Sequence, residues 1–476
     1  MRLSLKLAVS ASVFALFASS MPVKAMSLKE AVVEALTTNP EILQAAENRE
    51  AIEFELRQAK GLYLPSIDLN GVVGSRKLDN ASRRRLGTDD DMLYPRDVGV
   101  SITQTVFDGG DRRSEVERQA ARVDGAANRV YERSEGIALR VVQEYLEILL
   151  QSEIIKEIRN NVAFHQRMLG EIRQTEQGGA LTAADTTQAQ ERLLAAQAQY
   201  EQATEDLEVA KIRFNKLVGR QLTNPKFPAP VSGALPKSLD AAVTLARAQS
   251  PRIAASAADV DAADAHARGA RAAYLPKISL TGRAQYGQDS DGSEDDGTDL
   301  EALVVARWNL YRGGQDVARE QERIRRASEQ RYALHQAHRE IEETVRTAWD
   351  RRIKQAELSA TLRKQADANA RLVTSYNEQF RVGQRSLLDV LEAQNTRYNV
   401  SVQSKTSAYA SLFEEYRILA ATGSLARTMG AAAVEQAQAY ARDEFSVPQG
   451  KEPNYKRLPS KQASELPLDL LAPVRQ

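Results

Sequence analysis

The stretch Tyr63-Leu64-Pro65-Ser66-Ile67-Asp68-Leu69 occurs a second time as Tyr274-Leu275-Pro276-Lys277-Ile278-Ser279-Leu280, 211 positions further along the chain. Upstream of both copies, Asn39-Pro40 recurs at the same spacing as Ser250-Pro251. Self-similarity at a fixed spacing is the signature of a repeated structural unit. The sequence therefore predicts that the chain is built from two copies of one unit.

A second set of matches extends this duplication downstream. Val106-Phe107-Asp108-Gly109-Gly110 corresponds to Leu310-Tyr311-Arg312-Gly313-Gly314, and the segment from Gly179 to Asp185 corresponds to the segment from Gly383 to Asp389. Both pairs are 204 positions apart, so one change of seven residues separates the two sets. Ordered agreement at two independent places is hard to obtain by chance.

Four runs of about ten residues alternate between apolar and polar side chains, which is the period of a β-strand facing two environments. They lie at residues 65–75, 97–107, 276–287 and 300–311. The length suits a tilted strand that spans a membrane, and the polar positions include Arg and Glu, as in a water-filled lumen. A soluble sheet with one wet face is the alternative. Four strands cannot close a barrel and lipid does not tolerate open sheet edges, so the membrane interpretation requires oligomerisation.

Proline placement predicts long helices after these strands. No proline lies between Pro95 and Pro225 or between Pro276 and Pro448, although the chain has 15. Proline costs about 3 kcal/mol inside a helix, so such gaps are where long helices form. Apolar residues recur there at steps of three, four and seven, as in a coiled coil. A helix from about residue 111 to 177 would be roughly 100 Å long at 1.5 Å per residue.

The N-terminus and the composition restrict the compartment and the function classes. Arg2 and Lys6 precede an apolar run that ends before Val23-Lys24-Ala25, the pattern of a cleaved signal peptide. The 64 basic and 64 acidic residues balance, which disfavours nucleic acid as a partner, and the lack of cysteine excludes disulfides, thiolate metal sites and a lipid-bearing cysteine. The predicted organisation is a signal peptide at 1–25, a first repeat at 26–226, a linker at 227–237, a second repeat at 238–423 and a flexible C-terminal tail at 424–476.

These duplicated markers together resemble the TolC-like outer-membrane factors of Gram-negative bacteria, from Ser27 to about Gly423. The resemblance implies a mixed α/β membrane protein that is mainly α. It implies a homotrimer in which four strands per chain form a 12-stranded β-barrel in the outer membrane, continued by a long antiparallel coiled-coil α-helical barrel across the periplasm. A periplasmic adaptor, an inner-membrane transporter of the ABC or RND type and outer-membrane lipid are the implied partners.

The turns at the far end of the long helices are the candidate functional site. Each places Gly at a helix end, Thr or Ser as the N-cap of the next helix and an acid three residues later, so a capping box is the purely structural interpretation of Thr182 with Asp185. In the resembling family this segment is a constricted entrance. By position, the implied gate consists of Asp185, Phe380, Arg385, Asp389 and Glu392, with Arg385 pairing with Asp185, an acidic ring formed by Asp389 and Glu392, and Phe380 where the family has Tyr. The implied adaptor-binding tips consist of Gly179, Leu181, Thr182, Gly383 and Ser386.

The sequence predicts transport without chemistry. We find no nucleotide-binding loop and no catalytic constellation, so it indicates neither an enzyme nor a cofactor. Two sequence motifs most resemble the branch of this family that serves type I protein secretion. They are Gly61-Leu62-Tyr63-Leu64-Pro65 and Gln104-Thr105-Val106-Phe107-Asp108-Gly109-Gly110. Multidrug efflux is the alternative within this family, and a periplasmic coiled-coil scaffold is the alternative from another class.

Three further features have a functional and a structural interpretation. Trp308 and Tyr311 fit an aromatic girdle at the membrane interface, and ordinary strand packing explains them equally well. The acidic loop 287–299 fits ion binding but is more typical of a solvated loop. His335 and His338, with Glu342 nearby, have metal-ligand spacing, but no third ligand is fixed, so no metal site is expected.

Overall fold

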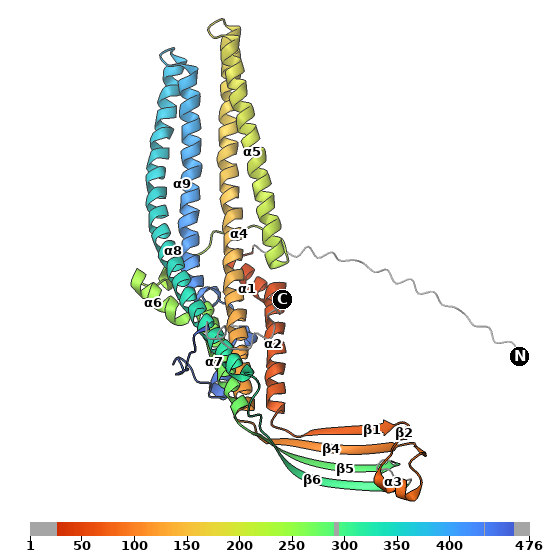
Figure 1. Cartoon of the computed structure of the whole chain (residues 1–476). Helices are drawn as coiled ribbons and strands as arrows, with labels where there is room; N and C mark the ends of the chain where they lie inside the picture. Colours follow the sequence, from red (N-terminus) through yellow and green to blue (C-terminus); the bar gives the residue numbers. More distant parts are fainter. Residues whose placement is uncertain (1–25, 290–294, 433, 461–476) are drawn as a thin grey trace, which may run out of the picture.

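The computed structural model describes residues 26–289, 295–432 and 434–460. The predicted signal peptide lies outside this range. Two pairs of long helices stand side by side, and a sheet of long strands projects from their lower end (Figure 1). In the described part of the chain, no helix is both long enough and apolar enough to cross a membrane.

The two repeats have the same order of main elements. The first contains α1 (Leu28–Thr38), α2 (Pro40–Gly61), β1 (Ser66–Val73), β4 (Arg96–Phe107), α4 (Asp111–Gln177) and α5 (Ala183–Val218). The second contains α6 (Leu239–Gln249), α7 (Pro251–Gly269), β5 (Lys277–Gln288), β6 (Asp296–Arg307), α8 (Gln315–Arg381) and α9 (Leu387–Ala421). The starts of α6, α7 and β5 follow those of α1, α2 and β1 by 211 positions, and α8 and α9 follow α4 and α5 by 204. The main elements of the second half thus follow those of the first in the same order and at the two spacings found in the sequence.

The long helices form where the proline-free spans predicted them. Both α4 and α8 have 67 residues, and α4 has the predicted bounds. In the half of each helix far from the sheet, α4 packs on α5 and α8 packs on α9; nearer the sheet, α4 lies against α2 and α7. On α5 every seventh residue is a buried alanine, namely Ala189, Ala196, Ala203 and Ala210. Small residues at this spacing keep the two helices close along a coiled-coil seam.

The four long strands form one antiparallel sheet in the order β1-β4-β5-β6. Its register gives the two faces opposite character. One row across the strands consists of Leu69, Val100, Ala284 and Leu300, and the neighbouring row consists of Asp68, Ser101, Arg283 and Glu301. Because adjacent rows point to opposite faces, one face is apolar and the other is polar. Leu69 is 74% exposed and Leu300 is 76% exposed, so this chain alone leaves the apolar face uncovered.

The structure corrects one predicted strand. The strand expected at 300–311 is β6, which begins at Asp296 and ends at Arg307. The cause is its pairing with β5, which runs from Gln288 opposite Asp296 to Lys277 opposite Arg307. This pairing draws acidic residues of the expected loop into the strand, where Asp296 accepts a hydrogen bond from the Tyr286 hydroxyl at 2.8 Å.

Each long strand is joined to one helix, and all four joints lie at one end of the sheet. The chain passes from α2 into β1, from β4 into α4, from α7 into β5 and from β6 into α8. The turn between β4 and α4 places Gly109 and Gly110 at φ of 70° and 89°, a region that side chains disfavour. A Cβ at Gly109 would also lie 3.0 Å from Leu275, so both the backbone conformation and the lack of space require glycine at this position.

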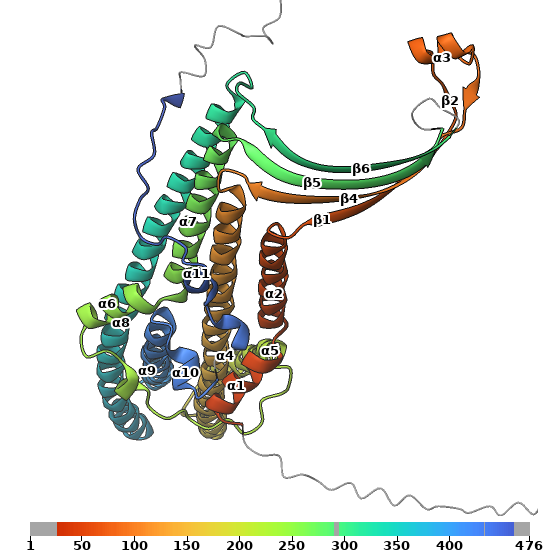
Figure 2. The ribbon, with the colours of Figure 1, turned by 90° about the horizontal axis from the view of Figure 1, so that it is seen from below.

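The opposite end of the sheet carries a small cap within the predicted polar loop 75–96. It contains β2 (Arg76–Lys77), α3 (Ala81–Leu86) and β3 (Met92–Leu93), with β2 and β3 paired. Seen from below, the sheet curves strongly and holds this cap far from the helices (Figure 2).

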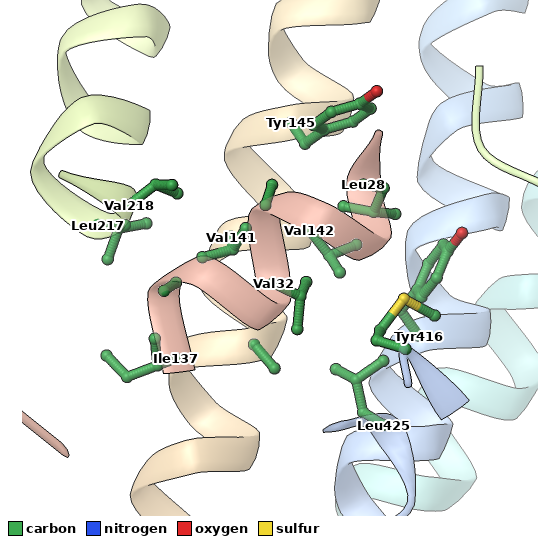
Figure 3. Packing of buried hydrophobic residues seen from close by; sticks show 14 of the residues in the cluster. Leu28, Val32, Ile137, Val141, Val142, Tyr145, Leu217, Val218, Tyr416 and Leu425 are labelled. Atoms are coloured by element: carbon green, nitrogen blue, oxygen red, sulfur yellow. The ribbon is translucent and has the colours of Figure 1, made fainter. Parts of the chain in front are cut away.

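A buried core joins both repeats near the middle of the helices (Figure 3). Tyr145 of α4 and Tyr416 of α9 are fully buried in it, together with Leu28 and Val32 of α1. The Tyr145 hydroxyl donates to the carbonyl of Lys226 at 2.8 Å, which ties the end of the first repeat to α4. The short helix α1 therefore packs its apolar side chains against the long helices and covers this core.

The prediction of a flexible tail at 424–476 is wrong for its described part. After α9 the chain forms α10 (Leu425–Thr428), η3 (Glu435–Ala437) and α11 (Ala441–Glu444), all lying against α4. Leu425 and Ala426 donate backbone N–H groups to the buried Glu135 carboxylate at 3.0 and 3.2 Å. Buried polar anchors, which leave no periodic pattern in the sequence, order this segment. Residues 461–476 lie outside the described range.

Candidate functional site

The two helical tips share one backbone design. Gly179, after α4, and Gly383, after α8, have φ of 80° and 77°. In each tip the next residue donates its N–H five positions back, from Ala180 to Thr175 at 3.2 Å and from Gln384 to Gln379 at 2.9 Å. This is the Schellman arrangement, in which a left-handed glycine satisfies the last carbonyls of a helix. It gives both tips tight, closely similar turns.

The acids at the start of the following helices differ in their partners. Asp185 completes a capping box, because its carboxylate accepts the Thr182 backbone N–H at 2.9 Å while the Thr182 hydroxyl accepts the Asp185 N–H. The Thr182 hydroxyl also donates to the Asp185 carboxylate at 2.8 Å, and the bonds that the carboxylate accepts from the Thr182 backbone N–H and then from this hydroxyl lower the pKa of the Asp185 carboxyl. In the second tip, Ser386 caps the N–H of Asp389 at 3.2 Å. The capping interpretation of Thr182 with Asp185 is thus confirmed.

Arg385 contacts groups of its own tip in the single chain. Its guanidinium lies 3.8 Å from the Asp389 carboxylate, donates to the Gln379 side chain at 3.2 Å and lies 4.3 Å from the centre of the Tyr376 ring. Among the described residues of this single chain, Arg385 forms its ion pair with Asp389 and not with Asp185. A pair between neighbouring subunits stays a prediction.

Sequence reasoning missed Tyr376. The aromatic that stacks on Arg385 is one helical turn before Phe380, the residue expected at this place. A search for aromatic residues at four-residue steps before the turn would have found it, since such steps share one helix face.

An apolar cluster below the turns joins the two tips. Leu181 from the first tip and Phe380 from the second pack against a buried group that includes Ile172 of α4 and Leu391 of α9. Above it, the Arg381 guanidinium lies 3.1 Å from the Glu171 carboxylate, which links α8 to α4. The two hairpins are therefore held together just below their turns.

The remaining gate candidate, Glu392, is exposed on α9 one turn beyond Asp389. Among the described residues, no basic side chain lies within ion-pair distance of the Glu392 carboxylate. Its charge is therefore available at the tip, close to the partly exposed Asp389.

The predicted girdle residues lie just beyond β6 instead of inside it. Trp308 is 60% exposed and donates its indole N–H to the Tyr274 carbonyl at 3.1 Å, and Tyr311 is 80% exposed. Both therefore lie at the junction between the sheet and the helices.

Glu342, which lies near His335 and His338 in the sequence, pairs with arginines in the structure. The Glu342 carboxylate binds Arg346 at 2.9 Å and also contacts Arg247. Over the described residues, no three carboxylate or imidazole side chains come together as a metal site. The middle of the acidic loop, residues 290–294, lies outside the described residues.

The chain resembles known proteins over nearly the whole of this architecture. The family model described as "Outer membrane efflux protein" matches residues 31–220 and 242–424. The outer membrane efflux protein BepC of Brucella suis is 24% identical over 399 residues, covering 83% of this chain and 85% of BepC. TolC of Vibrio cholerae is 24% identical over 425 residues, covering 85% of this chain and 92% of TolC.

A secretion protein and a solved channel show similar coverage. The alkaline protease secretion protein AprF of Pseudomonas aeruginosa is 24% identical over 397 residues, covering 81% of this chain and 82% of AprF. The structure of the CmeC outer membrane channel of Campylobacter jejuni superposes with a TM-score of 0.75 at 16% identity, covering 89% of this chain and 94% of CmeC. The chain therefore belongs to the outer membrane efflux protein family, the TolC-like channels of the Gram-negative outer membrane, which are not enzymes.

Proposed function

We propose that three copies of this chain form a passive export duct through the outer membrane. The observation that carries the proposal is the four-stranded sheet, which has an uncovered apolar face and a single neighbour for each of its edge strands β1 and β6. Lipid does not tolerate unpaired strand edges, so neighbouring copies have to supply the missing partners. Three copies would close a barrel of twelve strands, and the helix attached to each strand would continue its wall as a tunnel.

The helical tips, at the end opposite the sheet, are the proposed periplasmic entrance (Figure 1). Asp389 and Glu392 from three chains would place a ring of carboxylates around the axis, and such a ring attracts cations and repels anions. Arg385 would hold the entrance closed by pairing with Asp185 of a neighbouring chain. The turns around Gly179, Leu181, Thr182, Gly383 and Ser386 form the surface proposed for a periplasmic adaptor.

The gate is tested by single-channel conductance in planar lipid bilayers. A partly exposed ion pair contributes about 0.2–1 kcal/mol. Three such pairs together would change the ratio of open to closed channels by up to roughly 100-fold. Arg385→Ala should therefore raise the mean conductance. Arg363→Ala, an exposed site in the middle of α8, is the matched control and should leave it unchanged. An unaltered conductance in Arg385→Ala would remove the latch role from this residue.

For the cargo, we infer type I protein secretion, with an adaptor and an inner-membrane ABC transporter supplying the energy. The sequence motifs at residues 61–65, before β1, and 104–110, between β4 and α4, support this branch. The similarity to AprF, which is named as a protease secretion protein, supports it as well. The similarity to BepC, named as an efflux protein, supports the second candidate, drug efflux with an ABC or RND-type transporter.

Deleting the gene from its own bacterium separates the two candidates. Loss of one or a few large proteins from the culture medium, with unchanged drug susceptibility, is the result expected for secretion. Increased drug susceptibility with an unchanged set of secreted proteins would assign the duct to efflux. A strain complemented with the intact gene is the control.

A further inference from the structure

A cationic cavity lies where the sheet meets the helices. It has a volume of about 690 Å³ and is bounded by the end of α7 and the 3-10 helix η2 (Ala270–Tyr274) that follows it, the first turns of α4 and α8 and the adjoining ends of β4, β5 and β6. Its charged lining has many more cations than acids. The cations are Arg112, Lys277, Arg307, Arg312, Arg319 and Arg323, and the acids are Asp108 and Asp111. A cavity with such an excess of positive charge favours an anionic occupant.

Three of these cations have acceptors within the chain. Arg112 pairs with Asp108 at 2.7 Å, Arg319 lies 3.7 Å from Asp316, and Arg323 donates to the His266 carbonyl at 3.2 Å. The other three are Lys277, Arg307 and Arg312. Across the described ranges, none of these three has a carboxylate within the 4.0 Å that defines an ion pair.

The pairing of β5 with β6 places two of these cations opposite each other, which destabilises the sheet at this point. Lys277 lies directly opposite Arg307, whereas six residues along the same strand Arg283 lies directly opposite Glu301. Opposite charges in such cross-strand positions are stabilising and like charges are destabilising. The same pair of strands thus has a complementary pair away from the cavity and a repulsive pair at its wall. An anion bound between Lys277 and Arg307 would remove the repulsion.

Two further observations define the ligand and the side from which it enters. Asn309 lines the cavity, and its amide nitrogen is a buried donor without an acceptor in the described structure. Lys277 and Arg307 belong to the polar face of the sheet, because they lie an even number of residues from Arg283 and Glu301 along their strands. The cavity is therefore rich in donors and belongs to the face that turns away from lipid.

We propose that this junction pocket is an oxyanion-binding site for a dissolved phosphate, sulfate or carboxylate group, held by Lys277, Arg307 and Arg312. The pocket itself lies within one chain. Its position inside a duct rests on the proposed function: three copies would surround the passage with a cationic belt at the level where the barrel joins the tunnel. Such a belt would lie further along the passage than the acidic entrance and would have the opposite charge.

The test is calorimetric titration of the purified full-length protein with inorganic phosphate, at an ionic strength held constant with chloride. We expect saturable binding at one site per chain. Hydrogen bonds to charged groups contribute about 1.5–3 kcal/mol, so the double variant Lys277→Gln/Arg307→Gln should lose at least tenfold in affinity. Arg283→Gln, on the same face of the same strand, should bind phosphate like the wild type. Circular dichroism establishes that each variant is folded.

Thermal unfolding gives a second readout that separates repulsion from general damage. Without phosphate, Arg307→Gln should unfold at a higher temperature than the wild type, since it removes the like-charged pair. Phosphate should raise the unfolding temperature of the wild type and not that of the double variant. Absence of saturable binding, or equal affinity in the double variant, would overturn the site.

Vesicles distinguish the source of the anion. The protein is placed in phosphatidylcholine with or without phosphatidylglycerol, in buffer free of phosphate. Stabilisation by phosphatidylglycerol alone, with no response to dissolved phosphate, would overturn the placement on the duct side and assign the pocket to a lipid headgroup. A preparation that remains monomeric and still binds phosphate would retain the pocket while the proposed trimeric duct fails.

Discussion

At the scale of single residues, Glu135 makes the C-terminal contact sensitive to pH. Burial raises the pKa of this carboxyl to about 7, although the N–H groups of Ala426 and Leu425 act in the opposite direction. Its ordinary value is 4.5. Between these two pH values the folded chain binds more protons than the unfolded chain. The stability that the site contributes therefore decreases as pH rises through this window, by about 3 kcal/mol at most, and is constant above it.

Glu135→Gln should abolish this pH dependence, because the amide keeps an acceptor oxygen but does not ionise. We expect the hydrogen-exchange protection of α10, corrected for the intrinsic rate, to fall between pH 5 and pH 7.5 in the wild type and to stay level in the variant. Glu392→Gln, at an exposed site on α9, should behave like the wild type. If protection in the wild type were the same at both pH values, Glu135 would not ionise in this range.

At the scale of elements, the C-terminal segment connects the two repeats through α11. The buried Asp124 carboxylate of α4 accepts the N–H groups of Tyr440 and Ala441 at 2.9 and 2.8 Å. Arg442 then bridges Asp124, at 3.0 Å, and Asp261 of α7, at 2.7 Å. Since α4 belongs to the first repeat and α7 to the second, this one side chain fastens one repeat to the other.

Arg442→Ala should destabilise the helical wall near the sheet. It leaves two buried carboxylates without their cation, a change that typically costs about 3–5 kcal/mol. We expect a lower unfolding temperature and faster proteolytic cleavage near α11. Arg457→Ala removes an exposed pair with Glu452 in the same segment and should have little effect. Equal effects of the two substitutions would mean that the bridge does not hold the segment.

Local signals explain which elements the sequence could predict. The bounds of α4 follow from glycines at its start and its end and from the lack of proline between them, and the capping box at Thr182 is complete within four residues. The start of β6 depends instead on its register with β5. The C-terminal helices are four residues long, and their anchors lie about 300 positions away in the sequence. No local pattern records a contact of that kind.

The candidate site divides in the same way. The turn glycines and caps were predictable because they act on their own backbone. The contact of Arg385 with Tyr376 lies within one tip, so a search at helical steps before the turn could have found it. The attachment of one hairpin to the other depends instead on the cluster around Ile172 and Leu391, which joins residues far apart in the sequence. The pairing of Arg385 with Asp185 is a contact between chains, so it stays a prediction from the resemblance.

At the scale of the whole molecule, the orientation of the sheet decides whether the chain becomes part of a barrel. Ala284 and Gln285 are neighbours on β5 and point to opposite faces. Ala284 lies between Val100 and Leu300 in the apolar row, whereas Gln285 lies opposite Asp299 on the polar face. An arginine on the lipid face near the middle of a barrel costs about 2–4 kcal/mol, and a trimer would bear this cost three times.

Ala284→Arg should therefore prevent stable insertion, whereas Gln285→Arg, beside Asp299, should be tolerated. The measurements are the yield in outer-membrane fractions and the heat-modifiable migration of the trimer in detergent gels. The two variants carry the same added side chain on adjacent residues, so a difference between them reports the facing of the sheet and not the added charge. Equal insertion of both variants would mean that the apolar row does not face lipid, and with it the barrel of three chains would lose its physical basis.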